Sequence, residues 1–474
     1  MQSRRTFVRS LLQTSVALAS QHHLKLYSQQ ANHSSLKLSK SPAIEVPANF
    51  TGLGYEMSSV AEPGLLDPAN SRYINLVRGL GPQGVLRLGG IVANYTRYIP
   101  NGTAEHDRTN TVITRACLER LAAFLHRVGW TAIWSVNFAQ GTIDQAVAEA
   151  RAVSNVLGAK LLAIEIGNEV DSYGKGQPFR PSSYDYETYR KEYDKWYNVI
   201  AKAIPGLRFA APDTTPRAVD WTERMADDAH GEVQLLTTHY YRNGQARGSA
   251  EQLLTPDPKL NEMLAGLRAA SRRSGIPWRI CEINSFSGGG KPGVSDTFIG
   301  ALWTLHTMLL LAQDGCAGVN IETGVNQLGF VSSYSPIQDD GKGINSAGVP
   351  YYGMLAFANA FAGCHQLMPL ESASIGESTH VYVLGAQGKP RNVVIINMDS
   401  STTAHASLAG LNIEHANVLR LLAPAPDSKT GVTFGGTSVD ARGHWNAVTR
   451  ERITNGNVSV PPMTAAVIVA AHGT

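Results

Sequence analysis

Cysteine is scarce in this sequence, and the few cysteines form no motif. Four occur among 474 residues, at Cys117, Cys281, Cys316 and Cys364, with no CxxC pair and no Cys/His cluster. This spacing argues against a zinc centre and against a disulfide framework. We therefore expect free, buried thiols and neither a metal nor a cofactor.

Long apolar runs are missing as well. After the N-terminus, no segment reaches the ~18 uninterrupted apolar residues of a membrane-spanning helix. The first 19 residues contain the twin arginine Arg4-Arg5, a short apolar run at 11–19 and the small-residue ending Ala17-Leu18-Ala19. That order is typical of a twin-arginine signal peptide. We expect residues 1–19 to direct export, which makes the protein periplasmic or secreted, and we expect no membrane anchor.

The excess of basic over acidic side chains is confined to residues 1–19. The chain has 41 basic and 38 acidic side chains, a formal charge of +3, and residues 1–19 contain three arginines and no acid. Removing those three from the 41 basic residues leaves 38, which equals the number of acidic residues. A neutral chain gives no electrostatic sign of a nucleic-acid partner, so we expect none.

Strand-like and helix-like segments alternate through most of the chain. The β-rich runs are 50–57, 84–91, 131–138, 161–167, 207–212, 233–241, 278–283 and 318–322. Several of the connections between them have a helical pattern, and a helix near 351–360 would complete the last unit. This alternation predicts an α/β fold, a (β/α)8 barrel over residues 49–362. A doubly wound sheet is the competing interpretation, but no Gly-x-Gly-x-x-Gly follows the first run.

Beyond residue 363 the helical pattern stops. Short runs rich in β-branched residues follow at 381–384, 393–396, 418–422, 458–460 and 465–469, joined by Gly, Ser, Thr and Asn. They predict an antiparallel β-sandwich over 363–474. Strands within 36–48 precede the barrel and are expected to complete this sandwich, whereas we expect 20–35 to be a disordered leader.

Glutamates stand at the ends of the fourth and seventh predicted strands. The fourth ends at Asn168-Glu169 and the seventh contains Glu282. Barrel active sites are built at the C-terminal ends of the strands, and these two strands face each other across the mouth. Glycoside hydrolysis needs two such carboxyl groups, and an amide beside one of them can bind the sugar 2-hydroxyl. A lone glutamate at a strand end is usually a solvated loop residue. Two at these strands, with His239-Tyr240-Tyr241 ending the sixth, favour catalysis.

Three consecutive glycines follow Glu282 in the run Ser287-Gly288-Gly289-Gly290-Lys291. Pro292 comes next where a phosphate-binding loop has Ser or Thr, so that motif fits poorly. Glycines permit a positive φ and close approach of the backbone, which makes a nest of N–H donors for an anion. A carboxylate held beside Glu282 would be such an anion; a merely flexible linker is the alternative.

These motifs resemble glycoside hydrolase family 79, a family of retaining barrel glycosidases that includes bacterial β-glucuronidases and heparanases. The resemblance extends from about residue 43 to the end and is nearest to the exo-acting bacterial β-glucuronidases. It is carried by Gly167-Asn168-Glu169, His239-Tyr240-Tyr241 and the run 281–290, and it is extended by 51–58, 87–90, 295–298 and 323–330.

The resemblance implies roles for the strand-end residues. Glu169 would be the acid/base and Glu282 the nucleophile. One tyrosine of the pair Tyr240-Tyr241 would hydrogen-bond the nucleophile, and we favour Tyr241. Asn168 would bind the substrate.

The resemblance also implies how the sugar is held. The N–H groups of Gly288 and Gly289, with the hydroxyl of Tyr334, would bind the C6 carboxylate, and Glu56 would contact ring hydroxyls. Related enzymes have Asp where this chain has Asn94, and that Asp contacts the far hydroxyls. We expect Asn94 to contact them too, without a full charge.

The sequence therefore predicts a retaining β-glucuronidase, a monomer that hydrolyses terminal β-D-glucuronides, with carboxyl groups ~5–5.5 Å apart. One alternative is an endo-acting, heparanase-like enzyme on glycosaminoglycans, which needs a basic cleft that a neutral chain does not suggest. Others are a neutral-sugar specificity, such as a xylosidase or arabinofuranosidase, and a non-catalytic sugar-binding barrel.

Overall fold

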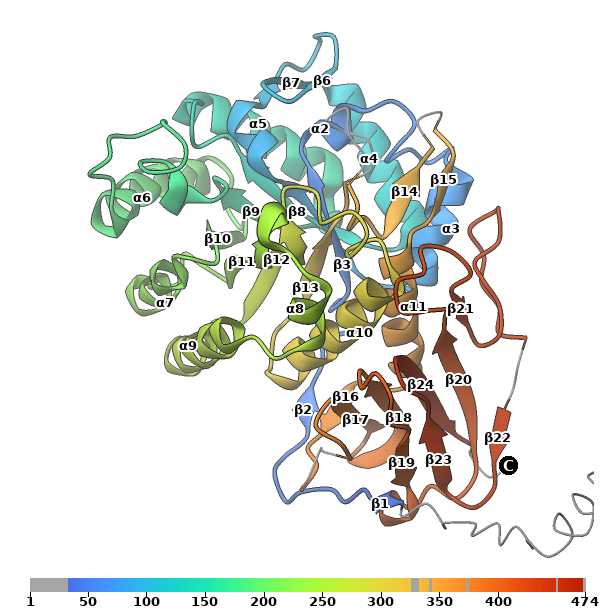
Figure 1. Ribbon diagram of the computed structural model, residues 1–474. Coiled ribbons are helices and arrows are strands. Elements are labelled where there is room, and N and C mark those ends of the chain that lie inside the picture. Colours follow the sequence, from blue (N-terminus) through green and yellow to red (C-terminus); the bar gives the residue numbers. More distant parts are fainter. Residues whose placement is uncertain (1–32, 325–331, 341–342, 372–374, 449–450, 472–474) are drawn as a thin grey trace, which may run out of the picture.

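The computed structural model describes residues 33–324, 332–340, 343–371, 375–448 and 451–471. Its largest unit is a closed barrel of parallel strands, with helices on the outside (Figure 1). The strands are β3 (Gly52–Glu56), β4 (Val85–Gly89), β8 (Thr131–Val136), β9 (Leu161–Ile166), β10 (Phe209–Thr214), β11 (Leu235–Gly244), β12 (Trp278–Ser287) and β13 (Val319–Glu322). The predicted (β/α)8 barrel is confirmed.

The outer helices follow the strands in the expected order. They are α3 (Ser71–Gly79), α4 (Arg115–Val128), α5 (Ile143–Leu157), α6 (Tyr186–Ala203), α7 (Val219–Asp228), α9 (Pro258–Ser274), α10 (Phe298–Gln313) and α11 (Val349–Ala360). Most bury one stripe against the barrel, as amphipathic helices do. Helices α10 and α11 are apolar on nearly every face because they also pack beside the C-terminal sheets (Figure 1).

The segment after α11 forms two antiparallel layers. One sheet has the order β2-β16-β17-β18-β24-β20-β21, with β22 also on β20; the other is β1-β19-β23. Their bounds are β16 (Gln366–Met368), β17 (Thr379–Ala386), β18 (Lys389–Asn397), β19 (Ala404–Ser407), β20 (Ala416–Leu422), β21 (Thr433–Phe434), β22 (Glu451–Ile453), β23 (Asn457–Val460) and β24 (Thr464–Ala470). Alternate residues of both sheets share a separate core, as a sandwich requires. The predicted sandwich is confirmed.

The N-terminal segment supplies two strands to this sandwich. Strand β2 (Ile44–Glu45) pairs with β16, as expected for 36–48. Strand β1 (Ser34–Ser35) pairs with β19, which corrects the expectation of a disordered leader at its last two residues. Residues 1–19, the rest of the leader to 32, and the motif residues 325–330 lie outside the described ranges.

Some short elements were not foreseen. They are α2 (Ser58–Ala61), α8 (Ala250–Leu254), the small sheet of β5 (Arg97–Tyr98), β6 (Glu105–Asp107) and β7 (Asn110–Ile113), and the hairpin of β14 (Ile337–Asp339) and β15 (Asn345–Ala347). All four cysteines are free thiols, and three of them are buried. Among the helices of the described ranges, none combines the length and apolarity needed to cross a membrane.

Arg279 fills the barrel at the end opposite the strand-end glutamates. Its guanidinium donates to Asn320 Oδ1 at 2.7 Å and to the carbonyls of Val319 and Phe50 at 3.0 and 3.2 Å. The side chain is buried, and burial lowers its pKa. Because its acceptors come from the start of β13 and from Phe50, two residues before β3, this arginine ties together the bottom of the barrel.

Replacing Arg279 by methionine should therefore destabilise the barrel. The variant keeps the side-chain volume but leaves buried acceptors unpaired, so we expect the free energy of unfolding to fall by about 3 kcal/mol or more. Urea unfolding followed by circular dichroism measures this. Arg272→Met, at the exposed C-terminal end of α9, is the matched control and should change stability by less than about 0.5 kcal/mol. Equal losses in the two variants would contradict the role given to Arg279.

Candidate active site

The structure brings Glu169 and Glu282 together at the barrel mouth. Each offers a carboxylate oxygen within 4.8 Å of the other. Glu169 follows β9 with φ of +49°, a conformation that non-glycine residues rarely adopt, and its N–H donates to the Asp213 carbonyl at 2.8 Å. Such strain is typical of functional sites. Oxygens this close are compatible with the ~5–5.5 Å between the carboxyl groups of a retaining pair and leave little room for the water of an inverting one.

Arg87 joins the strands around these two glutamates. This β4 side chain is fully buried, and its guanidinium donates to Glu282 Oε2 at 3.0 Å, to Glu165 Oε2 at 3.1 Å and to Asn168 Oδ1 at 2.7 Å. It also pairs with Asp213. Burial alone would lower its pKa, but the surrounding carboxylates outweigh burial and raise it. Arg87 therefore remains charged and fixes both the candidate nucleophile and the amide beside Glu169.

His239, on β11, is a second buried cation. Its Nε2 lies 2.9 Å from Asp213 Oδ1, and its Nδ1 lies 3.3 Å from Glu169 Oε1. Burial opposes protonation, but the carboxylates of Asp213 and Glu282 and the two hydrogen bonds raise the pKa of His239 well above its usual value. The imidazolium thus orients one oxygen of Glu169. Glu169, His239 and Glu282 converge to within 4.8 Å, and both ring nitrogens of His239 already face carboxylates.

The two tyrosines after His239 have different partners. Tyr241 donates its hydroxyl to Glu282 Oε1 at 2.8 Å, the contact that the sequence favoured for it. Tyr240 points to the other side of β11 and donates to Asp257 Oδ2 at 2.8 Å, because successive side chains of a strand alternate. Tyr240 is thus outside the nucleophile's contacts and instead lines a neighbouring cavity.

Two further carboxyl groups flank Glu282. Glu56, at the end of β3, accepts a hydrogen bond from the Val92 N–H at 2.9 Å. Burial, and then the charge of Glu282, raise its pKa to about 8. Glu322, at the end of β13, is buried, and burial with Glu282 and Glu56 raises its pKa well above the usual value. Both groups therefore carry a proton at neutral pH and can donate a hydrogen bond.

Asn94 lies behind the cavity and is held by two side chains. Its own side chain is fully buried in the 3-10 helix Ile91–Tyr95. Tyr173 donates to Asn94 Oδ1 at 2.7 Å, and Asn94 Nδ2 donates to Gln177 Oε1 at 3.1 Å. Gln177 in turn lines the cavity beside Glu169. Asn94 thus positions Gln177, and its contact with sugar hydroxyls stays a prediction.

The glycine loop has the predicted backbone conformation. Gly288, Gly289 and Gly290 have φ of +84°, +90° and +82°. Within the described ranges, no group accepts a hydrogen bond from the N–H of Gly288 or Gly289, so both donors are unpaired. The Ser333 N–H donates to the Gly289 carbonyl at 2.7 Å, which fixes the segment of Tyr334 against the loop.

Tyr334 lies between the loop and the acidic cluster. It is buried, and its ring centre is 6.3 Å from that of Tyr241. Burial, followed by the charges of Glu322 and Glu282, raises its pKa well above the usual value. Its hydroxyl therefore stays protonated and is a neutral donor.

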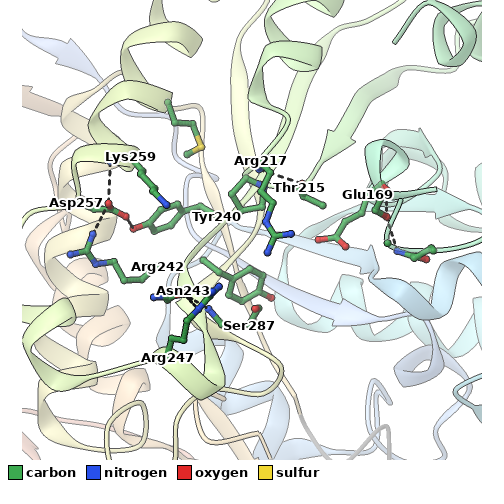
Figure 2. Close-up of a pocket in the computed structure, with 17 residues that line it drawn as sticks. Glu169, Thr215, Arg217, Tyr240, Arg242, Asn243, Arg247, Asp257, Lys259 and Ser287 are labelled. Carbon is green, nitrogen blue, oxygen red and sulfur yellow. Dashed lines mark hydrogen bonds and ion pairs between the residues drawn. The ribbon is translucent and has the colours of Figure 1, made fainter. Parts of the chain in front are cut away.

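A cavity of about 430 Å³ opens beside Glu169 (Figure 2). Glu169, Tyr241 and Ser287 are among the residues that line it. The side chain of Glu169 is 25% exposed and that of Glu282 only 12%, so Glu282 lies deeper than the cavity and Glu169 at its edge.

This geometry defines a class of protein. Two carboxylates at retaining distance, at the C-terminal ends of β9 and β12 of a (β/α)8 barrel, form the site of a glycoside hydrolase. Of the residues around them, sequence reasoning did not assign Arg87, His239 or Glu322 to the site. His239 and Arg87 stand within motifs that carry the family resemblance, and Glu322 ends the eighth predicted strand, but their roles depend on contacts that the sequence does not show.

Comparisons with known proteins agree with this class. Residues 381–467 match the family model of the glycosyl hydrolase family 79 C-terminal beta domain. A β-glucuronidase of Aspergillus niger is 24% identical over 370 residues, covering 66% of this chain and 67% of that protein. One from Neurospora crassa is 27% identical over 236 residues, covering 43% of this chain and 40% of that protein.

A solved structure supports the fold. The 4-O-α-L-rhamnosyl-β-D-glucuronidase of Fusarium oxysporum superposes with a TM-score of 0.77 at 17% identity, covering 92% of this chain and 100% of that one. The resemblance to glycoside hydrolase family 79 is thereby confirmed, and the chain is a glycoside hydrolase.

Glu56 should set an alkaline limit on activity. Below a pH of about 8 it is a neutral acid; above that pH it becomes an anion beside Glu282. We expect kcat/KM to fall as pH rises through about 8, and Glu56→Gln, which cannot ionise, to shift that fall upward. Glu149→Gln is the control, since Glu149 is also buried with a raised pKa but bonds Trp134 elsewhere. An unchanged alkaline limb in Glu56→Gln would contradict this assignment.

Proposed function

We propose that this protein is a retaining β-glucuronidase that releases terminal β-D-glucuronic acid. The observation that carries the proposal is the Glu169–Glu282 pair, with oxygens within 4.8 Å, beside a loop of open N–H groups. The names of the two fungal relatives and of the Fusarium enzyme support the same substrate.

Glu282 acts as the nucleophile. Arg87 and Tyr241 each hold one of its oxygens, which aims the carboxylate at C1 of the sugar. Glu169 gives a proton to the glycosidic oxygen while the C1–O bond breaks and a covalent glycosyl-enzyme forms. Glu169, now a carboxylate, then takes a proton from water, which attacks C1 and frees Glu282.

Neutral donors recognise the acid sugar. The N–H groups of Gly288 and Gly289 and the Tyr334 hydroxyl bind the C6 carboxylate, and the protonated Glu56 donates to a ring hydroxyl. Asn168, whose oxygen is held by Arg87, presents its amide to the 2-hydroxyl. These donors are neutral, whereas the buried cation Arg87 is already engaged by Glu165, Asp213 and Glu282.

We further propose that the mature chain is exported by the twin-arginine route and acts as a monomer. The order of charge, apolar run and small residues in 1–19 supports export.

A substrate panel with active-site variants tests the proposal. The wild type should hydrolyse p-nitrophenyl β-D-glucuronide and leave p-nitrophenyl β-D-xyloside nearly untouched. Glu282→Gln should lose several orders of magnitude in kcat while keeping the fold. Azide should rescue Glu169→Ala as the β-glucuronosyl azide and Glu282→Ala as the α-anomer, because each variant leaves a different face open. Rescue with the opposite pattern would reverse the two roles.

Tyr334→Phe tests the recognition of the acid. Losing one hydrogen bond to a charged carboxylate costs ~1.5–3 kcal/mol, so we expect kcat/KM on the glucuronide to fall about 10- to 100-fold. Residual activity on the xyloside, which has no such carboxylate, should stay the same. Tyr98→Phe, a tyrosine of the small sheet, serves as a control. A parallel loss on both substrates would show that Tyr334 does not read the carboxylate.

A further inference from the structure

A second cavity lies where the barrel meets the β-sandwich. Its volume is about 240 Å³, and its walls come from α8, α9 and α10 of the barrel and from β17 of the sandwich, which adjoin in Figure 1. It shares Tyr240, Arg242 and Asp257 with the cavity beside Glu169, and Figure 2 shows these three side chains on the side away from Glu169. Neither Glu169 nor Glu282 lines the second cavity. It is therefore separate from the catalytic pair.

Buried aromatic and aliphatic side chains form much of its lining. They include Trp303 of α10, Tyr382 of β17, Leu253 of α8 and Leu260 of α9. An apolar cavity of about 150 Å³ is already large enough to hold a benzene molecule. The second cavity therefore has room for one substituted aromatic ring, and junctions between domains are common places for such sites.

The lining has no net charge. Among its described residues, the full charges are those of Arg242 and Asp257, which neutralise each other in an ion pair of 2.6 Å. Burial lowers the pKa of both His306 and His380, and the neighbouring His380 lowers that of His306 further. Both imidazoles are therefore neutral at neutral pH. Because burying an unpaired charge is costly, such a cavity selects against ions.

The two histidines leave one polar group available to a ligand. Their rings, from α10 and β17, are stacked with centres 3.8 Å apart. The Tyr382 hydroxyl lies 2.9 Å from His306 Nδ1 and occupies that nitrogen. Within the part of the chain that the structure describes, the imidazole of His380 has no hydrogen-bond partner. A neutral imidazole has one donor and one acceptor, so His380 can bind a hydroxyl group.

We propose that this cavity is a binding site for a small, uncharged aromatic molecule with a hydroxyl group, whose ring packs against Trp303 and whose hydroxyl bonds His380. Asn261, an exposed residue of α9, also lines the cavity, so the molecule can enter from solvent. The site goes beyond the proposed function and does not depend on it.

Matched fluorinated probes test the chemistry of the ligand. Fluorine NMR of the full chain would follow titration with 4-fluorophenol, for which we expect a Kd of about 1 mM or tighter. Fluorobenzene lacks the hydroxyl and should bind about threefold more weakly or worse. The anion 4-fluorobenzoate and the cation 4-fluorobenzylammonium should bind about tenfold more weakly or worse, because the cavity gives a charge no unpaired partner.

Variants locate the site. Asn261→Trp fills the entrance with an indole ring and should raise the Kd of 4-fluorophenol about tenfold or more. Glu262→Trp is the matched control, since Glu262 is the next residue of α9, is exposed and does not line the cavity. His380→Phe keeps an aromatic ring but removes both nitrogens, so the preference for 4-fluorophenol over fluorobenzene should disappear. Thermal unfolding confirms that each variant is folded.

Three results would overturn the site. They are no binding of 4-fluorophenol at about 10 mM, equal affinities for 4-fluorophenol and its charged analogues, and a wild-type Kd in Asn261→Trp. The hydrolysis of p-nitrophenyl β-D-glucuronide is measured separately, so any of these results leaves the proposed function standing.

Discussion

The active-site geometry depends on one buried cation. Arg87 has no exposed surface, and removing a guanidinium from water costs several kcal/mol that only close carboxylates can offset. Its partners Glu165, Asp213 and Glu282 lie on three different strands, so a closed barrel is what brings them to it. Arg87 then holds one carboxylate oxygen of Glu282, and Tyr241 holds the other.

The same cations divide the acidic residues of the mouth into two kinds. Asp213 lies between Arg87 and His239; burial favours its neutral form, but the two cations outweigh burial and lower its pKa. Glu56 and Glu322 have no such direct contact, and their pKa values are raised. One cluster of carboxyl groups thus supplies both a fixed anion and neutral hydrogen-bond donors. Asp213 differs from the others in touching two cations, whereas burial and the charge of Asp213 raise the pKa of Glu165, which touches Arg87 alone.

Sequence reasoning found the features that a strand or a loop carries by itself. The strand ends holding Glu169 and Glu282 and the positive φ of the glycine loop could be predicted because each depends on a few consecutive residues. The role of Arg87 could not be assigned from the sequence, because it arises from contacts with residues of three other strands. The partners of Asn94 could not be predicted for a similar reason: Tyr173 and Gln177, which hold its side chain, follow it by some eighty residues. The strand β1 also depends on a distant partner, β19.

Net charge does not register how charge is arranged at the barrel mouth. Two buried cations, Arg87 and His239, pair with Asp213, and Arg87 also holds Glu282. The donors that we propose for the substrate carboxylate are neutral, and Tyr334 stays protonated there because burial and the nearby carboxylates raise its pKa. Cations farther out, at Arg217, Arg247 and Lys259, are exposed, so water and salt screen their effect on Glu169 within about 10 Å. A formal charge of zero is therefore compatible with strong local fields of either sign.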